Sequence, residues 1–287
     1  TITIGTGDKT VSAANLNTID GITTVAVNAS NVTTISSSTL DSVHTLYTSS
    51  GVSGLGNEAI TVSDSGSIAA STLSAIAAVN TSGTIKATSA ATVTGTAAEI
   101  IAAFGNSTIT EATNVAITVN SGTASLSQAR TIDGYTTGVV TATIADTRVS
   151  DLVGSSPLLD ANGNNAFTVT IGTADAEITA ANLTTLNGLT SVAIEAGNVT
   201  KITGTVAATN TVYAAAGNSE INGLGNEAVV ISGESSNTLS DASTLNTLDG
   251  YTTGTVNAGS LTTIKGDVSD LLTAYASNGI TGLGNEA

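Results

Sequence analysis

Short runs of alternating apolar and polar residues recur along the chain. The first such run, Ile2-Thr3-Ile4, places β-branched apolar residues on either side of a threonine. An alternation of period two is typical of a β-strand with one buried face, so each run predicts a strand. Counterparts of this run occur at 60–62, 117–119, 169–171 and 229–231.

A second set of runs keeps its outer positions apolar while its central residue varies. Val27-Asn28-Ala29 is the first member, and the central residue of the others is Lys, Thr, Glu or Asn. A position that accepts both Lys and Glu is expected to face solvent and not to form a repeated binding site. The other members lie at 85–87, 140–142, 194–196 and 256–258.

Apolar residues spaced three and four positions apart lie between the strand runs and predict short helices. In 268–275 they stand at i, i+3, i+4 and i+7, directly after Asp267. Similar patterns follow Thr96 and Asp241, and both residue types are favoured as N-caps. Four aromatic residues hold the same place in the later helix of a repeat, and we expect them to pack in the core: Tyr47, Phe104, Tyr213 and Tyr275.

Aligning these runs divides the 287 residues into five repeats of about 57 residues. A period of this length is typical of repetitive architectures. We therefore predict one array over residues 1–287, a β-solenoid with short helices (an α/β repeat) whose parallel strands stack in a straight, polygonal rod. The chain is expected to be a fragment of a longer repeat protein. The repeats span 1–59, 60–114, 115–165, 166–228 and 229–287.

Helix width constrains this arrangement. A helix is about 10 Å across, whereas stacked strands are about 4.8 Å apart. Successive helices therefore do not fit on one side of a straight stack of strands. We expect the two helices of each repeat to lie on different sides.

Composition and charge exclude several classes of partner. The chain carries 22 acidic and 6 basic residues, a net charge of −16 at pH 7, which excludes nucleic acid and anionic membranes as partners. A mean hydropathy of +0.30 argues against a disordered chain. No apolar stretch reaches the roughly 18 residues of a membrane-spanning helix, so we expect no membrane insertion.

Two kinds of turn carry candidate metal ligands. Asp160, Asn162 and Asn164 alternate as in a calcium loop, but Ile171 stands where an EF-hand needs a bidentate acid. The alternative is a turn rich in Asn and Gly. The hexapeptide Gly-Leu-Gly-Asn-Glu-Ala places the other candidates, which are Glu58, Glu227 and Glu286.

These three glutamates also have two interpretations. They could bind a cation together with a neighbouring Asn or Asp. Alternatively, the hexapeptide is a turn in which Gly takes a positive φ and Asn caps the backbone. We predict no cofactor, with calcium as the alternative.

The remaining polar residues do not suggest catalysis. His44 is the single histidine and has no counterpart in other repeats, so we expect an exposed helix residue. Acidic residues are scattered among the repeats, whereas glycoside cleavage needs paired carboxylates in a cleft. The chain is therefore predicted not to be an enzyme. A column of threonines leaves ice binding open, although the fifth repeat has Val230: Thr3, Thr61, Thr118 and Thr170.

The segment Thr244 to Ile264, which reads TLNTLDGYTTGTVNAGSLTTI, resembles repeats of giant cell-surface or secreted proteins of bacteria, particularly marine cyanobacteria. The hexapeptide looks similar to the same family. The resemblance covers the whole chain and brings no catalytic residues with it. It implies an extracellular or cell-surface location.

These observations predict a structural role. We expect a rigid extracellular spacer or adhesive stalk of a giant bacterial surface protein. The alternative is a repeat module that is stabilised by calcium or binds a ligand such as carbohydrate or ice. The expected partners are neighbouring repeats of the same chain, together with end-to-end self-association.

Overall fold

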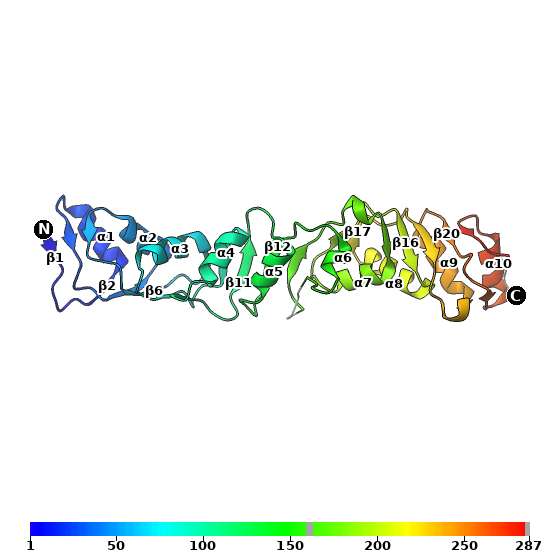
Figure 1. Ribbon diagram of the computed structural model, residues 1–287, viewed down its shortest axis with the longest axis horizontal. Helices are drawn as coiled ribbons and strands as arrows, with labels where there is room; N and C mark the ends of the chain where they lie inside the picture. The colour runs from blue at the N-terminus through cyan, green and yellow to red at the C-terminus, as the bar shows by residue number, and fades with distance from the viewer. Residues whose placement is uncertain (159–162, 285–287) are drawn as a thin grey trace. The chain divides into compact units, whose positions relative to one another are not determined.

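The computed structural model describes residues 1–158 and 163–284, and the chain divides into two compact units. We call residues 1–143 the N-terminal half and residues 144–287 the C-terminal half. Each half is an α/β structure in which short parallel strands alternate with helices (Figure 1).

The N-terminal half contains five α-helices within the described residues. The helices are α1 (Ala13–Ile22), α2 (Leu40–Thr48), α3 (Ala70–Val79), α4 (Ala97–Phe104) and α5 (Leu126–Asp133). The strands are β1 (Ile2–Thr3), β2 (Thr10–Ser12), β3 (Val27–Asn28), β4 (Thr34–Ser38), β5 (Val52–Ser53), β6 (Ala59–Val62), β7 (Ser67–Ala69), β8 (Ile85–Lys86), β9 (Thr92–Gly95), β10 (Ile109–Thr110), β11 (Ala116–Val119) and β12 (Val140–Thr143).

All strand pairs of this half are parallel, and they fall into separate sheets. One sheet has the order β1-β3-β5, a second has the order β10-β8-β6-β4-β2, and β12, β11, β9 and β7 are neighbours in a third. The predicted first strand of a repeat pairs with the second strand of the same repeat, as in Ile2 with Val27 and Ile60 with Ile85. Parallel strands need long crossover connections, and the helices provide them.

The core of this half lies between strands and helices. In the second sheet, Ile35, Ile60 and Ile85 are paired neighbours and are at most 1% exposed. Leu16 and Leu73, each at the same position of its helix, are fully buried as well. One apolar residue in each short strand is therefore enough to build a continuous interior.

The C-terminal half repeats this organisation. Its helices are α6 (Val149–Leu152), α7 (Ala180–Asn187), α8 (Val206–Gly217), α9 (Ala242–Tyr251) and α10 (Val268–Ala276), with 3-10 turns η1 (Thr173–Asp175) and η2 (Ser235–Asn237). Its strands are β13 (Ala166–Thr168), β14 (Glu177–Thr179), β15 (Ile194–Glu195), β16 (Lys201–Gly204), β17 (Ile221–Asn222), β18 (Ala228–Ile231), β19 (Thr238–Leu239), β20 (Val256–Asn257), β21 (Thr263–Ile264) and β22 (Ile280–Thr281).

The largest sheet of this half has the order β14-β16-β18-β20-β22, and two-stranded sheets pair β15 with β17 and β19 with β21. The strand predicted at 169–171 is reduced to a single bridge between Thr170 and Glu195. The other four predicted first strands and all five predicted second strands are present.

The predicted fold class is wrong. Strands of the described residues form several separate parallel sheets, and no closed or continuous solenoid sheet exists among them. The predicted distribution of helices is also wrong. Successive helices pack against one another from α1 to α5, and again from α6 to α10. The structure is therefore an α/β fold with ten described helices and not a β-solenoid rod.

Local signals set the helix starts. Thr96 and Glu99 form a capping box at α4, in which the Thr96 amide donates to the Glu99 carboxylate at 2.8 Å. Asp241 caps α9 as predicted, accepting a hydrogen bond from the amide of Ser243. Asp267 precedes α10 but makes no capping hydrogen bond with its side chain.

Candidate functional site

The hexapeptide turn is built around a buried glutamate. In the first repeat, Gly54 and Gly56 adopt positive φ values of 84° and 150°, as the sequence predicted. The capping group is the carboxylate of Glu58, which accepts hydrogen bonds from the amides of Gly56 at 2.8 Å and Asn57 at 3.1 Å. The expectation that Asn would cap this turn is therefore wrong.

A tyrosine from the preceding helix also donates a hydrogen bond to this carboxylate. The Tyr47 hydroxyl donates to Oε2 of Glu58 at 2.6 Å, and Glu58 is only 3% exposed. Burial raises the pKa of Tyr47 well above its usual range, and the hydrogen bond to Glu58 and the charge of Glu58 add to this effect. The tyrosine thus remains a proton donor to the buried carboxylate.

The fourth repeat builds the same arrangement. Glu227 is fully buried, and its Oε2 accepts hydrogen bonds from the Tyr213 hydroxyl at 3.0 Å and the Gly225 amide at 2.8 Å. Burial and the charge of Glu227 raise the pKa of Tyr213 well above its usual range. Two turns, about 170 residues apart in the chain, therefore use identical chemistry.

The backbone of each buried glutamate is held by the repeat that follows. The Asn80 side chain accepts from the Glu58 amide and donates to the Glu58 carbonyl, both at 2.9 Å. The Thr252 hydroxyl donates to the Glu227 carbonyl at 2.8 Å. These contacts fasten the hexapeptide turn to the C-terminal end of the next helix.

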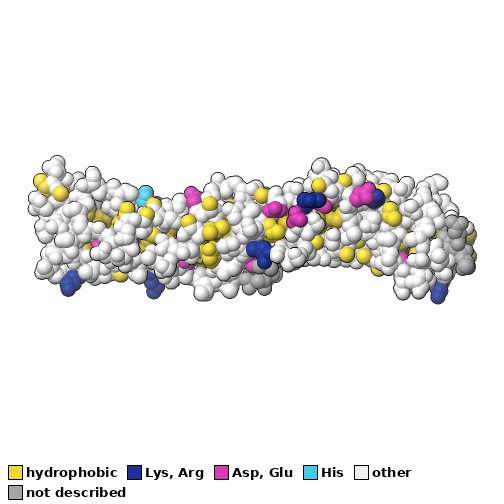
Figure 2. All heavy atoms as spheres, in the orientation of Figure 1, with side chains coloured by type: hydrophobic (Ala, Val, Ile, Leu, Met, Phe, Trp, Pro, Cys, Tyr) yellow, Lys and Arg dark blue, Asp and Glu magenta, His cyan; other side chains and the backbone are white. Residues whose placement is uncertain are grey.

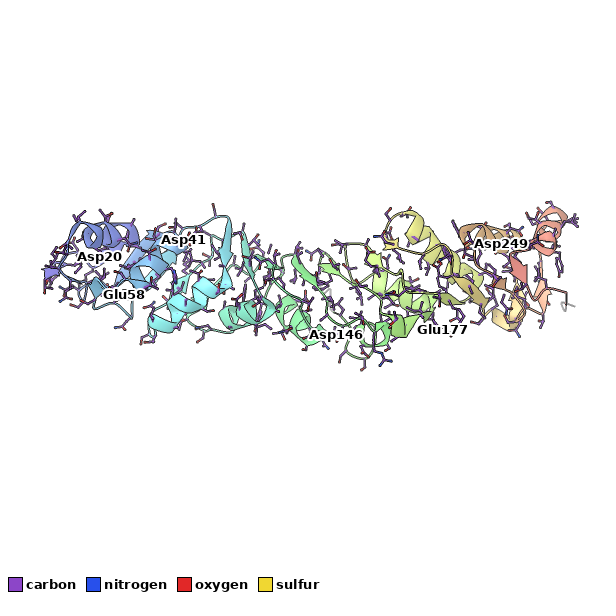
Figure 3. The ribbon with its side chains drawn as sticks, turned by 90° about the horizontal axis from the view of Figure 1, so that it is seen from above. Asp20, Asp41, Glu58, Asp146, Glu177 and Asp249 are labelled. Carbon is purple, nitrogen blue, oxygen red and sulfur yellow. The ribbon has the colours of Figure 1, made fainter. Side chains whose placement is uncertain are left out.

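A second recurring contact joins an aspartate at the end of one helix to a serine after the next helix. The Ser49 hydroxyl donates to Asp20 at 2.6 Å, and the Ser277 hydroxyl donates to Asp249 at 2.7 Å. Asp20 and Glu58 lie in the N-terminal half and Asp249 in the C-terminal half (Figure 3). These carboxylates hold the two helices of one repeat together.

The other candidate metal ligands do not form a metal site within the described residues. Asp160, Asn162 and Glu286 lie outside the described residues. Asn164 is half-buried, and its backbone carbonyl accepts a hydrogen bond from Ser191. Within 1–158 and 163–284, no group of three or more His, Cys, Asp or Glu side chains could hold a metal ion.

The remaining sequence candidates are not brought together. His44 is half-buried on α2 rather than exposed, and its backbone carbonyl accepts from Thr48. Lys201 forms an ion pair with Glu177 at 2.6 Å across paired strands β16 and β14. Figure 2 shows one face of the molecule, on which charged side chains are scattered among uncharged ones.

The sequence contains one signal for the tyrosine–glutamate contact, which is that the tyrosine recurs ahead of the hexapeptide glutamate. Tyr47 precedes Glu58 by 11 residues, and Tyr213 precedes Glu227 by 14. The tyrosine and the hexapeptide recur together, but their patterns predict two separate features, a core residue and a turn. Buried acids are rare enough that a turn was the default interpretation.

Comparisons with family models, curated proteins and solved structures find no match to this chain. Among the described residues, no helix is both long and apolar enough to span a membrane.

Proposed function

We propose that this chain is a structural repeat segment, an extracellular spacer or adhesive stalk of a giant bacterial surface protein. One observation carries the proposal. The carboxylates of Glu58, Glu227, Asp20 and Asp249 are held by hydrogen bonds inside their own repeats, and the backbones of Glu58 and Glu227 are hydrogen-bonded to the repeat that follows. Carboxylates held by these hydrogen bonds do not converge on a common cleft.

Charge and sequence resemblance support the extracellular part of the proposal. A net charge of −16 at pH 7 favours solubility and discourages binding to nucleic acid. The resemblance of 244–264 to repeats of giant surface proteins favours the same environment.

The structural part is tested by removing one complete repeat. Ile60 and Ile117 hold equivalent positions, and both pair with the second strand of their own repeat, at Ile85 and Val140. Deleting residues 60–116 joins Ala59 to Ile117 and preserves this register. A repeat protein should remain folded and unfold cooperatively, since each repeat contacts mainly its neighbours.

A deletion out of phase is the matched control. Removing 60–106 joins Ala59 to Ser107, so that polar Ser107 takes the position of Ile60 and the strand residue Ile109 comes two positions late. Circular dichroism and thermal unfolding should show a folded protein for the first deletion and a large loss of ordered structure for the second. Equal damage from both deletions would contradict the proposal.

The spacer and adhesive versions are separated by a retention assay. Beads coated with the chain are washed over polysaccharide and mineral surfaces under flow. Retention above uncoated beads supports the adhesive version, and its absence supports a spacer. In producing cells, a spacer should also be replaceable by an unrelated inert repeat of the same length without loss of surface display.

A further inference from the structure

A hollow of about 300 Å³ lies beside the hexapeptide turn of the fourth repeat. Two stacked aromatic rings line it, Tyr213 from α8 and Tyr251 from α9, with centroids 5.8 Å apart. Tyr213 is 3% exposed, as predicted for the aromatic residue of this helix, and Tyr251 is 41% exposed. The same prediction is wrong for the equivalent Tyr275 of α10, which is 49% exposed. In the fourth repeat, one buried ring thus supports a second ring that is open to the hollow.

The rest of the lining carries few large side chains. It includes Ala216 and Gly217 at the end of α8, followed by Gly223 and Gly225 of the turn. A Cβ added to Gly217 or Gly225 would meet no other atom within 4 Å. Small residues therefore keep the space beside Tyr251 open.

The turn of the first repeat has these glycines but not the second ring. Gly54 and Gly56 hold the places of Gly223 and Gly225. Val79 stands where α9 has Tyr251, and it is 48% exposed. Because Val79 belongs to the second repeat, with a repeat on either side, this position is open to solvent within the array.

The equivalent turn of the second repeat has the ring pair but not the glycines. Phe104 stacks on Tyr135 with centroids 5.3 Å apart. Glu111 and Thr113 take the places of the two glycines, so side chains stand where the fourth repeat has none. Of these three turns, the fourth repeat alone combines an exposed ring with an open turn.

The chemistry of the lining favours an uncharged ligand that carries hydroxyl groups. Within the described residues, no charged side chain lines the hollow. Asn222 lines it, and its side-chain amide donates to Glu195 at 2.8 Å, which orients the amide and leaves its oxygen as an acceptor. Ligand pockets combine apolar or aromatic walls with a few polar groups over about 300–1,000 Å³, so this hollow suits a single ring. A sugar ring fits both features, because its C–H groups pack on an aromatic face while its hydroxyls form hydrogen bonds.

We propose that the hollow binds one pyranose unit of a neutral polysaccharide, packed against Tyr251 and hydrogen-bonded to Asn222. The proposal rests on the adhesive version of the proposed function, and it names the class of surface that is held. A net charge of −16 at pH 7 disfavours acidic polysaccharides. A single open site should bind weakly, with a Kd of about 1–10 mM, and many chains on one surface would add their contacts.

Isothermal titration calorimetry with hexasaccharides of glucose, mannose and N-acetylglucosamine tests the site. At least one of these sugars should bind with one site per chain. Tyr251→Ala should weaken its binding about three- to tenfold, because the aromatic contact is lost. Tyr251→Phe keeps the ring and should bind within about twofold of the wild type.

Filling the hollow is a second test that leaves the stacked rings in place. Gly217→Leu puts a side chain into the open space and should abolish measurable binding. Gly21→Leu is the matched control, since a Cβ added to Gly21 on α1 also meets nothing within 4 Å and lies outside the hollow. It should bind like the wild type, and thermal unfolding confirms that both variants are folded.

Three results would overturn the proposal. The first is no binding of any of the three hexasaccharides at about 10 mM. The second is equal binding by Gly217→Leu and Gly21→Leu. The third is tighter binding of a proline-rich peptide than of any sugar, which would assign the hollow to a protein partner.

Retention of coated beads on a neutral polysaccharide separates this site from the adhesive function. Equal retention of wild-type and Gly217→Leu beads would support adhesion and contradict the site. Sugar binding in solution without retention of the beads would support the site and contradict adhesion.

Discussion

At the scale of single residues, carboxylates act as internal connectors in this protein. Through one carboxylate oxygen, Glu58 accepts hydrogen bonds from a tyrosine hydroxyl and two backbone amides, and Glu227 accepts from a tyrosine hydroxyl and one amide. Buried charges are costly unless they are satisfied by hydrogen bonds, so the tyrosine and the glutamate depend on each other. Acidic residues in this chain therefore stabilise its turns as well as forming part of its surface.

Tyr213→Phe should lower the free energy of unfolding by about 1–3 kcal/mol, because Glu227 loses its hydroxyl donor while remaining buried. Urea denaturation measures the loss. Tyr251→Phe is the control, since this ring stacks on Tyr213 but is 41% exposed, and it should cost less than about 0.5 kcal/mol. Equal costs would show that the hydroxyl of Tyr213 is unimportant.

Glu111 should make stability depend on pH. Burial raises its pKa from 4.5 to about 7. The folded state then holds a proton that the unfolded state releases, so stability falls as pH rises between about 4.5 and 7. Because Glu111 is partly exposed, solvent screening limits the effect to about 1 kcal/mol or less.

The variant Glu111→Gln removes this titration. Its melting temperature should exceed that of the wild type at pH 8 and match it at pH 4, as measured by circular dichroism. A difference that is the same at both pH values would contradict the assignment.

At the scale of elements, the sequence predicted the strands with apolar residues at alternate positions and missed those with a single large aliphatic residue. Strands β2, β4, β7 and β9 read TVS, TISSS, SIA and TVTG. Such segments resemble polar loops, and they form strands because a parallel neighbour in register supplies the hydrogen bonds. The helices were found more readily, since their apolar spacing and caps are local signals.

Glycine positions distinguish close packing from open surface. A Cβ added to Gly254 would lie 2.2 Å from the Glu227 carbonyl oxygen, whereas one added to Gly250 on α9 meets nothing within 4 Å. Gly254→Ala should therefore destabilise by about 1–3 kcal/mol. Gly250→Ala should stabilise by about 0.5–1 kcal/mol, because alanine is the better helix former. Chemical denaturation of both variants checks the opposite signs.

At the scale of the whole molecule, acidic charge outweighs basic charge by 16 at pH 7. Repulsion between the acidic side chains destabilises the folded state, and salt screens it. Raising NaCl to about 0.5 M should increase the melting temperature by about 2–4 °C, equivalent to about 1 kcal/mol. A decrease would mean that attractive pairs such as Lys201–Glu177 dominate.

The error in the predicted fold class also belongs to this scale. Strand residues were aligned correctly, as the pairing of Ile60 with Ile85 shows. The arrangement of the helices depends on where one sheet ends and the next begins. The residues of a single strand do not indicate whether that strand lies at the edge of a sheet. For the candidate site, the positive φ of Gly54 followed from the hexapeptide, whereas burial of Glu58 required knowledge of where Tyr47 lies.

The register of the strands has a consequence for folding. Ile2 pairs with Val27, Val27 with Val52, and Val229 with Val256. The partner of each of these strands therefore lies only 25 to 27 residues further along the chain. Contacts of low sequence separation close quickly, because little loop entropy is lost. The chain can thus acquire structure progressively as it leaves the ribosome, before its final residue is made.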